Sequence, residues 1–118
     1  DARAFPWGAT FDPQRVKSAY DLDFVTAAVD SYPNGVSPYG AYNLSGNVWE
    51  WTADWYDEDY YAAAPHNSPT GPPTGTLKTL RGGGYGVFDA AMRTSLRRDM
   101  DPETRVPYIG FRCARSAQ

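Results

Sequence analysis

The stretch NLSGNVWEW, residues Asn43 to Trp51, places one glutamate between two tryptophans, directly after a turn-like run of small and polar residues. Asn, Ser and Gly at its start are typical of a tight turn. The following VWEWTADWY alternates β-favouring residues and predicts a strand. We expect Trp49 and Trp51 to anchor that strand in the core. Glu50 then either points to water or is neutralised by a partner.

The composition of the chain indicates a single globular domain rich in turns. Its 118 residues are 42% hydrophobic and 21% charged, and 11 Gly with 10 Pro favour short strands and ordered loops over helices. The net charge of −3 argues against nucleic-acid binding, and no apolar run approaches the roughly 20 residues of a membrane helix. Because the first residue is Asp1 rather than Met, we interpret the chain as processed or as part of something longer.

The remaining segments predict further strands and loops. TLKTLRGGGY indicates a strand entering three glycines, whose spacing fits close backbone approach or positive φ rather than phosphate binding. VPYIGFRCAR reads as a short apolar strand, and FDPQRVKSAYDLDFVTAAVDSYP as mostly irregular chain. DAAMRTSLRRDMD has fair helix propensity. His66 lies in a Pro- and Gly-rich stretch that predicts an exposed loop.

Three segments in order, YGAYNLSGNVWEWTADWY, LRGGGY and IGFRCAR, together resemble the formylglycine-generating enzyme family, also called sulfatase-modifying factor domains. The match covers nearly the whole chain from FPWG onward. It implies an α+β, divergent C-type-lectin-like fold, loop-rich with short antiparallel strands, and extended or irregular structure instead of a helix in DAAMRTSL. It also implies that residues 1–118 form one domain lacking the family's N-terminal half. A missing segment or a second chain is then expected to cover the exposed sheet edge.

The same resemblance implies that Glu50 has a calcium ion as its partner. The ligands would be the Asn43 side chain, the Gly46 carbonyl, the Val48 carbonyl and the Glu50 side chain, and calcium accepts such a set of oxygens. The alternative is that the turn is merely capped and that Glu50 meets an arginine. At a second calcium site of the family this chain has Lys17, whose ammonium would supply the positive charge, so we expect one ion only.

Catalysis by the family's copper chemistry is not expected from this chain. The two copper-binding cysteines of the family match Val87 and Met92, and a soft Cu(I) ion requires thiolate ligands. No catalytic residue is therefore assigned. Cys113 is predicted to be a core thiol or the partner of a cysteine in a missing segment.

Ligand recognition is the function that we expect, on the face formed by residues 84–108. The candidate ligand-binding residues are Tyr85, Phe88, Asp89, Arg98, Met100 and Tyr108. The ligand would be a protein or a small molecule. One branch of the family, the variable proteins of diversity-generating retroelements, diversifies this face, and several residues here could derive from asparagine codons by adenine changes. Three alternatives stay open: drifted loop residues, an enzyme with catalytic groups outside this chain, and a structural module of a larger bacterial protein.

Overall fold

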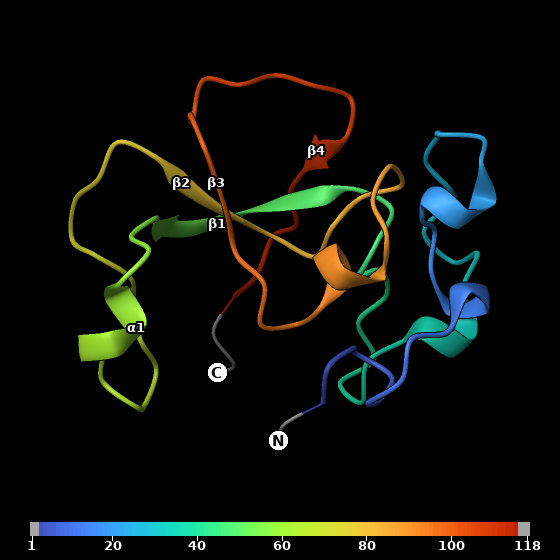
Figure 1. Cartoon of the computed structure of the whole chain (residues 1–118), viewed down its shortest axis with the longest axis horizontal. Helices are drawn as coiled ribbons and strands as arrows, with labels where there is room; N and C mark the ends of the chain where they lie inside the picture. Colours follow the sequence, from blue (N-terminus) through green and yellow to red (C-terminus); the bar gives the residue numbers. More distant parts are fainter. Residues whose placement is uncertain (1–2, 116–118) are drawn as a thin grey trace.

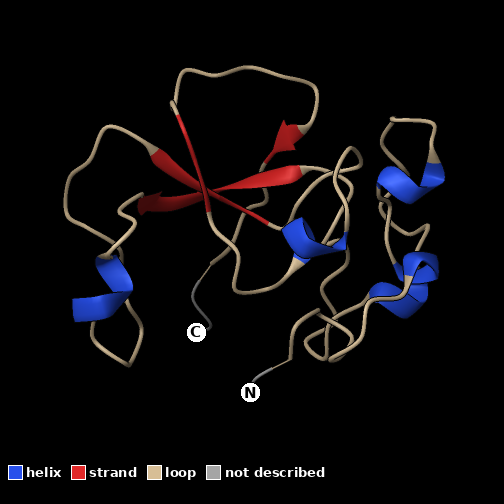
Figure 2. Ribbon diagram, in the orientation of Figure 1, coloured by secondary structure: helices blue, strands red, loops and turns tan. Residues whose placement is uncertain are grey.

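A four-stranded sheet forms the centre of the computed structural model, which describes residues 3–115. In Figure 1 the segment that precedes the sheet stands on one side of it, and helix α1 (Tyr60–Ala63) stands on the other. Loops and turns make up most of the chain between these elements (Figure 2). The prediction of a loop-rich α+β fold is confirmed.

The sheet combines antiparallel and parallel pairings in the order β3-β2-β1-β4. Strand β2 pairs antiparallel with both β1 and β3, whereas β4 pairs with β1 in parallel. The loop of residues 101–108 arches from β3 to the opposite edge of the sheet (Figure 1), so β4 runs in the same direction as β1. The predicted short antiparallel strands are present as β1, β2 and β3, and β4 adds a parallel pairing that was not predicted. The strands are β1 (Trp49–Trp55), β2 (Lys78–Arg81), β3 (Arg98–Met100) and β4 (Ile109–Gly110).

Strand β1 confirms the strand predicted after the turn, but only one of its two flanking tryptophans is fully buried. Trp49 is 4% exposed, because the glycine loop that follows β2 covers its ring, with Gly84 directly against it. Trp51 is only partly buried, so the expectation that both tryptophans anchor the strand in the core is wrong for Trp51. Glu50, between them, is also partly buried.

The segment before β1 is largely irregular, as predicted, and is shaped by three short 3-10 turns. Asp12 accepts a hydrogen bond from the Gln14 backbone N–H and so caps the first turn. Ser18 and Asp21 form a reciprocal capping box at the second, which satisfies two backbone donors at once. The turns are η1 (Pro13–Arg15), η2 (Ala19–Asp21) and η3 (Pro33–Gly35).

The hydrophobic core joins this N-terminal segment to the region after β2. Phe5, Val16 and Met92 form its fully buried centre, and Phe5 stacks on Trp7 with 5.6 Å between ring centroids. Met92 ends a single 3-10 turn, η4 (Asp89–Met92), after which the chain continues irregularly to β3. The longer helix favoured by local propensity does not form, and apart from this turn the segment is irregular, as the family resemblance implied.

Two residues with reactive side chains lie at the surface. His66 is exposed in the loop between α1 and β2, as predicted. Cys113 is exposed and unpaired, so the expectation of a core thiol is wrong. The chain beyond β4, residues 111–115, runs along the surface and places Cys113 outside the core. Across residues 3–115, no helix has the length and apolar character to cross a membrane.

Candidate functional site

The NLSGN turn holds together segments that are far apart in the sequence. Its backbone is left-handed at Asn43, Gly46 and Asn47, with φ values of 51°, 76° and 65°. The Gly46 N–H donates to the Gly82 carbonyl at 2.8 Å, and the Asn47 N–H donates to the Lys17 carbonyl at 2.9 Å. The turn therefore connects the N-terminal segment to the glycine loop.

Side chains of the same turn complete this connection. The Ser45 hydroxyl donates to the Met92 carbonyl at 2.7 Å, and both groups are buried. The Asn47 amide makes two hydrogen bonds with Ala27, accepting from its N–H at 2.9 Å and donating to its carbonyl at 3.3 Å. Ser45 and Asn47 are thus structural residues that position the loops around β1.

Glu50 finds its partner in Arg112, which lies beyond β4. The guanidinium donates to both carboxylate oxygens, at 2.6 and 2.5 Å, and to the backbone carbonyls of Tyr42 and Asn43, at 2.9 and 3.0 Å. The hydrogen bond with Glu50 raises the pKa of Arg112. Of the two partners left open by the sequence, an arginine is therefore in place.

The four groups implied as calcium ligands all offer oxygen atoms, which calcium prefers. Their one negative charge, on Glu50, is already balanced by Arg112. Asn43 donates its amide N–H to the Val29 carbonyl at 3.1 Å, which leaves its side-chain oxygen as an acceptor. Glu50 and Arg112 together are neutral, so calcium would add two uncompensated charges unless it displaced the guanidinium. The donor types fit calcium, and the charge balance fits weak binding. Beside them is a cavity of about 390 Å³ lined by Val29, Tyr42, Asn43, Asn47, Val48, Glu50, Phe111 and Arg112.

Lys17 is buried and pairs with two carboxylates. Its ammonium lies 2.5 Å from the Asp23 carboxylate and 3.8 Å from that of Asp21. The hydrogen bond between Lys17 and Asp23 raises the pKa of Lys17 and lowers that of Asp23. A positive charge is thus built into this loop, and the absence of a second calcium ion stays a prediction.

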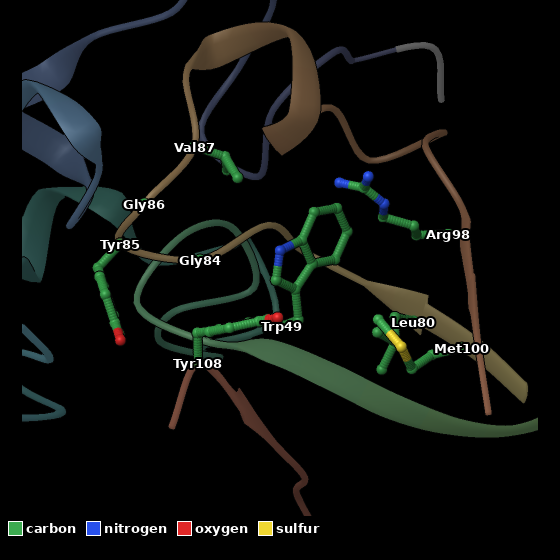
Figure 3. Close-up of a pocket in the computed structure, with 9 residues that line it drawn as sticks. All are labelled: Trp49, Leu80, Gly84, Tyr85, Gly86, Val87, Arg98, Met100 and Tyr108. Carbon is green, nitrogen blue, oxygen red and sulfur yellow. The ribbon is translucent and has the colours of Figure 1, made fainter. Parts of the chain in front are cut away.

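A second cavity, of about 350 Å³, lies between the glycine loop and the sheet (Figure 3). This volume is at the small end of the range of ligand pockets. Figure 3 shows the Trp49 indole at its centre, with Arg98 beyond the six-membered ring and Tyr108 on the opposite side. We call it the Trp49 pocket. Its lining residues are Trp49, Leu80, Gly84, Tyr85, Gly86, Val87, Arg98, Met100 and Tyr108.

Four of the six predicted ligand-binding residues line the Trp49 pocket: Tyr85, Arg98, Met100 and Tyr108. Phe88 and Asp89 are not among the lining residues and contact Tyr20 instead. The Phe88 ring packs edge-on against that of Tyr20 with 5.0 Å between centroids, and the Asp89 carboxylate accepts a hydrogen bond from the Tyr20 hydroxyl at 3.4 Å. The ligand-binding role of all six stays a prediction.

Sequence reasoning missed the floor of the pocket. Trp49 was expected to serve the core, and Leu80 was assigned only to a strand. In the sheet, Leu80 pairs with Arg98 on one side and with Trp51 on the other. That register depends on residues distant in sequence, so local patterns offered no signal for the floor of the pocket.

The positions matched to the copper-binding cysteines, Val87 and Met92, both have side chains close to Gly83. A Cβ atom placed on Gly83 would be 3.0 Å from the Met92 side chain and 3.1 Å from that of Val87. The two positions are thus neighbours in space, but Val87 has no atom able to bind a metal. Copper does not fit this pair.

The fold and the turn-strand arrangement define a sulfatase-modifying-factor type of domain. A family model, the sulfatase-modifying factor enzyme 1-like domain, matches residues 1–117, and the chain belongs to this family.

The proteins similar to this chain carry names that describe different activities. The formylglycine-generating enzyme of Streptomyces coelicolor is 37% identical, over 98% of this chain and 41% of that protein. Serine/threonine-protein kinase pkn1 of Chlamydia pneumoniae is 40% identical, over 98% of this chain and 18% of that protein. The structure of Treponema denticola variable protein 1 aligns with a TM-score of 0.72 at 23% identity, over 87% of this chain and 37% of that one. This last likeness concerns the fold alone. The chain spans less than half the length of each.

Proposed function

We propose that this domain recognises a ligand in the Trp49 pocket and carries out no chemistry with its own residues. The observation that carries the proposal is the pocket itself, where apolar walls from Trp49, Leu80 and Met100 meet the guanidinium of Arg98. A concave apolar site with a few polar groups is the usual form of a ligand pocket.

One observation supports a role without catalysis by the copper chemistry of the family. Val87 has no side-chain atom that can bind copper, and Met92 is fully buried in the core. Ligand recognition in the Trp49 pocket requires no metal-binding pair at these two positions.

The fraction of each relative's length that this chain matches favours a second candidate function. It corresponds to 18% of the Chlamydia kinase at 40% identity, which supports a recognition or structural module within a larger bacterial protein. The corresponding share of the formylglycine-generating enzyme, 41%, leaves an enzyme with catalytic groups outside this chain as the further alternative.

Replacing Tyr108 by alanine tests the pocket. Ligands are first identified by screening a fragment and peptide library. Because Tyr108 forms one wall of the pocket, its loss should lower the affinity of these ligands by about tenfold. Binding is followed by chemical shifts of the Trp49 indole N–H. Tyr39→Ala is the matched control, because Tyr39 is 88% exposed and lies outside the pocket. Ligands that bind equally well to both variants contradict the proposed site, and copper-dependent oxidation of a thiol peptide by this chain contradicts the non-catalytic role.

The proposal includes a retroelement-diversified origin for the pocket face. The positions compatible with adenine changes in asparagine codons include Gly86, Val87, Arg98 and Tyr108, all of which line the pocket. We expect the same locus in sister isolates to vary mainly between Tyr85 and Tyr108. Sequences that are uniform there, or that vary equally elsewhere, contradict this origin.

We further propose that one calcium ion binds at Asn43, Gly46, Val48 and Glu50. Because Arg112 already balances Glu50, we expect a dissociation constant of about 10⁻⁴–10⁻³ M. Calcium at ten times that concentration should stabilise the domain by about 1.4 kcal/mol, measured as a raised melting temperature that a chelator reverses. Asn43→Gly should abolish the shift, because glycine tolerates the left-handed backbone and lacks the ligand oxygen. An unchanged melt with no bound metal contradicts the calcium site.

A further inference from the structure

We propose that the Trp49 pocket recognises a carboxylate carried on an apolar group, with Arg98 as the residue that binds the carboxylate. This inference rests on the proposed function, since it specifies the ligand of the same pocket. The ligand class is an apolar monocarboxylic acid, either a free small molecule or the C-terminus of a peptide that ends in an apolar residue.

The guanidinium of Arg98 has no anionic partner within the part of the chain that the structure describes. Among the described residues it makes no side-chain hydrogen bond or ion pair, and its one ring contact is with Trp49, whose centroid lies 5.7 Å from the guanidinium carbon. The neighbouring Arg97 differs, because it donates to the carbonyls of Asp57 and Glu58 and lies over two tyrosine rings. Arg98 thus retains all of its hydrogen-bond donors for a ligand.

Three other polar side chains of the pocket can also donate a hydrogen bond and have no acceptor among the described residues. The Trp49 indole N–H and the hydroxyls of Tyr85 and Tyr108 make no hydrogen bond with any described residue. No described buried side-chain nitrogen or oxygen lacks a partner, so the indole nitrogen is reached by solvent. Figure 3 shows this nitrogen on the side of the ring that faces Gly84, away from Arg98. A ligand can therefore place a carboxylate at Arg98 and a second acceptor near the indole N–H.

The single positive charge of the pocket favours a ligand that carries one negative charge. None of its nine lining residues is acidic, and Arg98 is its one charged residue. A single guanidinium matches a carboxylate in charge and in bidentate geometry, whereas a phosphate with nearly two charges would remain under-neutralised. The guanidinium carbon lies 5.7 Å from the Trp49 ring centroid, within the range of a cation–π contact, so the positive charge is held beside the apolar floor of the pocket.

The walls of the pocket require that the carboxylate be attached to an apolar body. Leu80, Val87 and Met100 contribute aliphatic and thioether surface, and the Trp49 and Tyr108 rings provide flat faces. Removing an apolar group from water against these walls provides binding free energy, and Arg98 provides orientation. An exposed ion pair alone would contribute little, so small hydrophilic acids are not expected to bind.

The test compares acids with their uncharged amides on the intact chain. The probes are 3-phenylpropionate and 3-phenylpropionamide, and a short peptide ending in Phe with a free or an amidated C-terminus. Binding is measured by titration of the Trp49 indole N–H resonance. We expect each acid to bind about three- to fivefold more tightly than its amide, because Arg98 is exposed and its ion pair is weakened by solvent. Whether the small acid or the free peptide binds more tightly distinguishes the two ligand sources.

Arg98→Gln should lower the affinity for the acids to that for the amides and leave the amides unaffected. Arg105→Gln is the matched control, because Arg105 is exposed and outside the pocket. Arg98→Lys should retain part of the preference, and the melting temperature checks that each variant folds. Equal binding of acid and amide, or an unchanged preference in Arg98→Gln, overturns the carboxylate inference while leaving a ligand pocket. If no probe binds, the carboxylate inference is likewise overturned, and the wider library used with Tyr108→Ala decides the proposed function separately.

Discussion

Replacing Gly46 by alanine should strongly destabilise this domain. Gly46 has φ of 76°, a region that an alanine occupies only with strain. A Cβ atom there would also overlap the Val16 side chain and the Lys17 carbonyl oxygen. The carbonyl is fixed, because it accepts the Asn47 N–H at 2.9 Å. We expect a loss of at least about 4 kcal/mol, against the roughly 5–15 kcal/mol of a typical domain, measured by urea unfolding.

Two other glycines separate the contributions of strain and overlap. Gly40 has a similar φ of 78° but open space around its Cβ position, so Gly40→Ala should show only the backbone strain, about 1 kcal/mol. Gly86 has open space without positive φ, so Gly86→Ala should be nearly neutral. If Gly46→Ala were no more destabilising than Gly40→Ala, the close approach of the turn to Lys17 would be refuted. A melt of each variant decides this.

Local patterns predicted the features that depend on neighbouring residues. The turn at Asn43–Gly46 and the strand after it were predictable, because small residues and β-favouring residues act over a few positions. The strand entering the glycines was predictable for the same reason, and β2 ends at Arg81 directly before them. These segments also carry the family resemblance, which is why fold class and family followed from them.

Features that depend on distant pairs were not predictable from the sequence. Arg112 reaches Glu50 across 62 positions, so the motif alone left calcium and arginine both open as partners. Trp51 was expected to be buried like Trp49, but only Trp49 lies under the glycine loop. The Trp49 pocket gathers residues from strands β1, β2 and β3, the glycine loop and the loop before β4, and only their packing brings them together.

Replacing Arg112 by methionine should give the second-largest loss of stability. The substitution removes four hydrogen bonds and leaves the Glu50 carboxylate, 19% exposed, without its partner. Removing one partner of a fully buried ion pair destabilises a protein by about 3–5 kcal/mol. Because the Arg112 side chain is 39% exposed, water compensates in part, and we expect about 2 kcal/mol. The melting temperature should fall by about 6–12 °C.

A double-substitution cycle identifies the source of that loss. Glu50→Gln keeps the shape of the side chain but removes the charge, so adding it to Arg112→Met should restore part of the stability lost in Arg112→Met. Arg105→Met is the matched control, because Arg105 is an exposed arginine outside this contact, and it should change the free energy of unfolding by less than about 0.5 kcal/mol. Losses that simply add in the double variant would mean that the carbonyls of Tyr42 and Asn43, rather than Glu50, are the groups that depend on Arg112. The turn and strand β1 would then be joined to the chain beyond β4 through backbone hydrogen bonding, and Glu50 would be available to calcium at little cost to the fold.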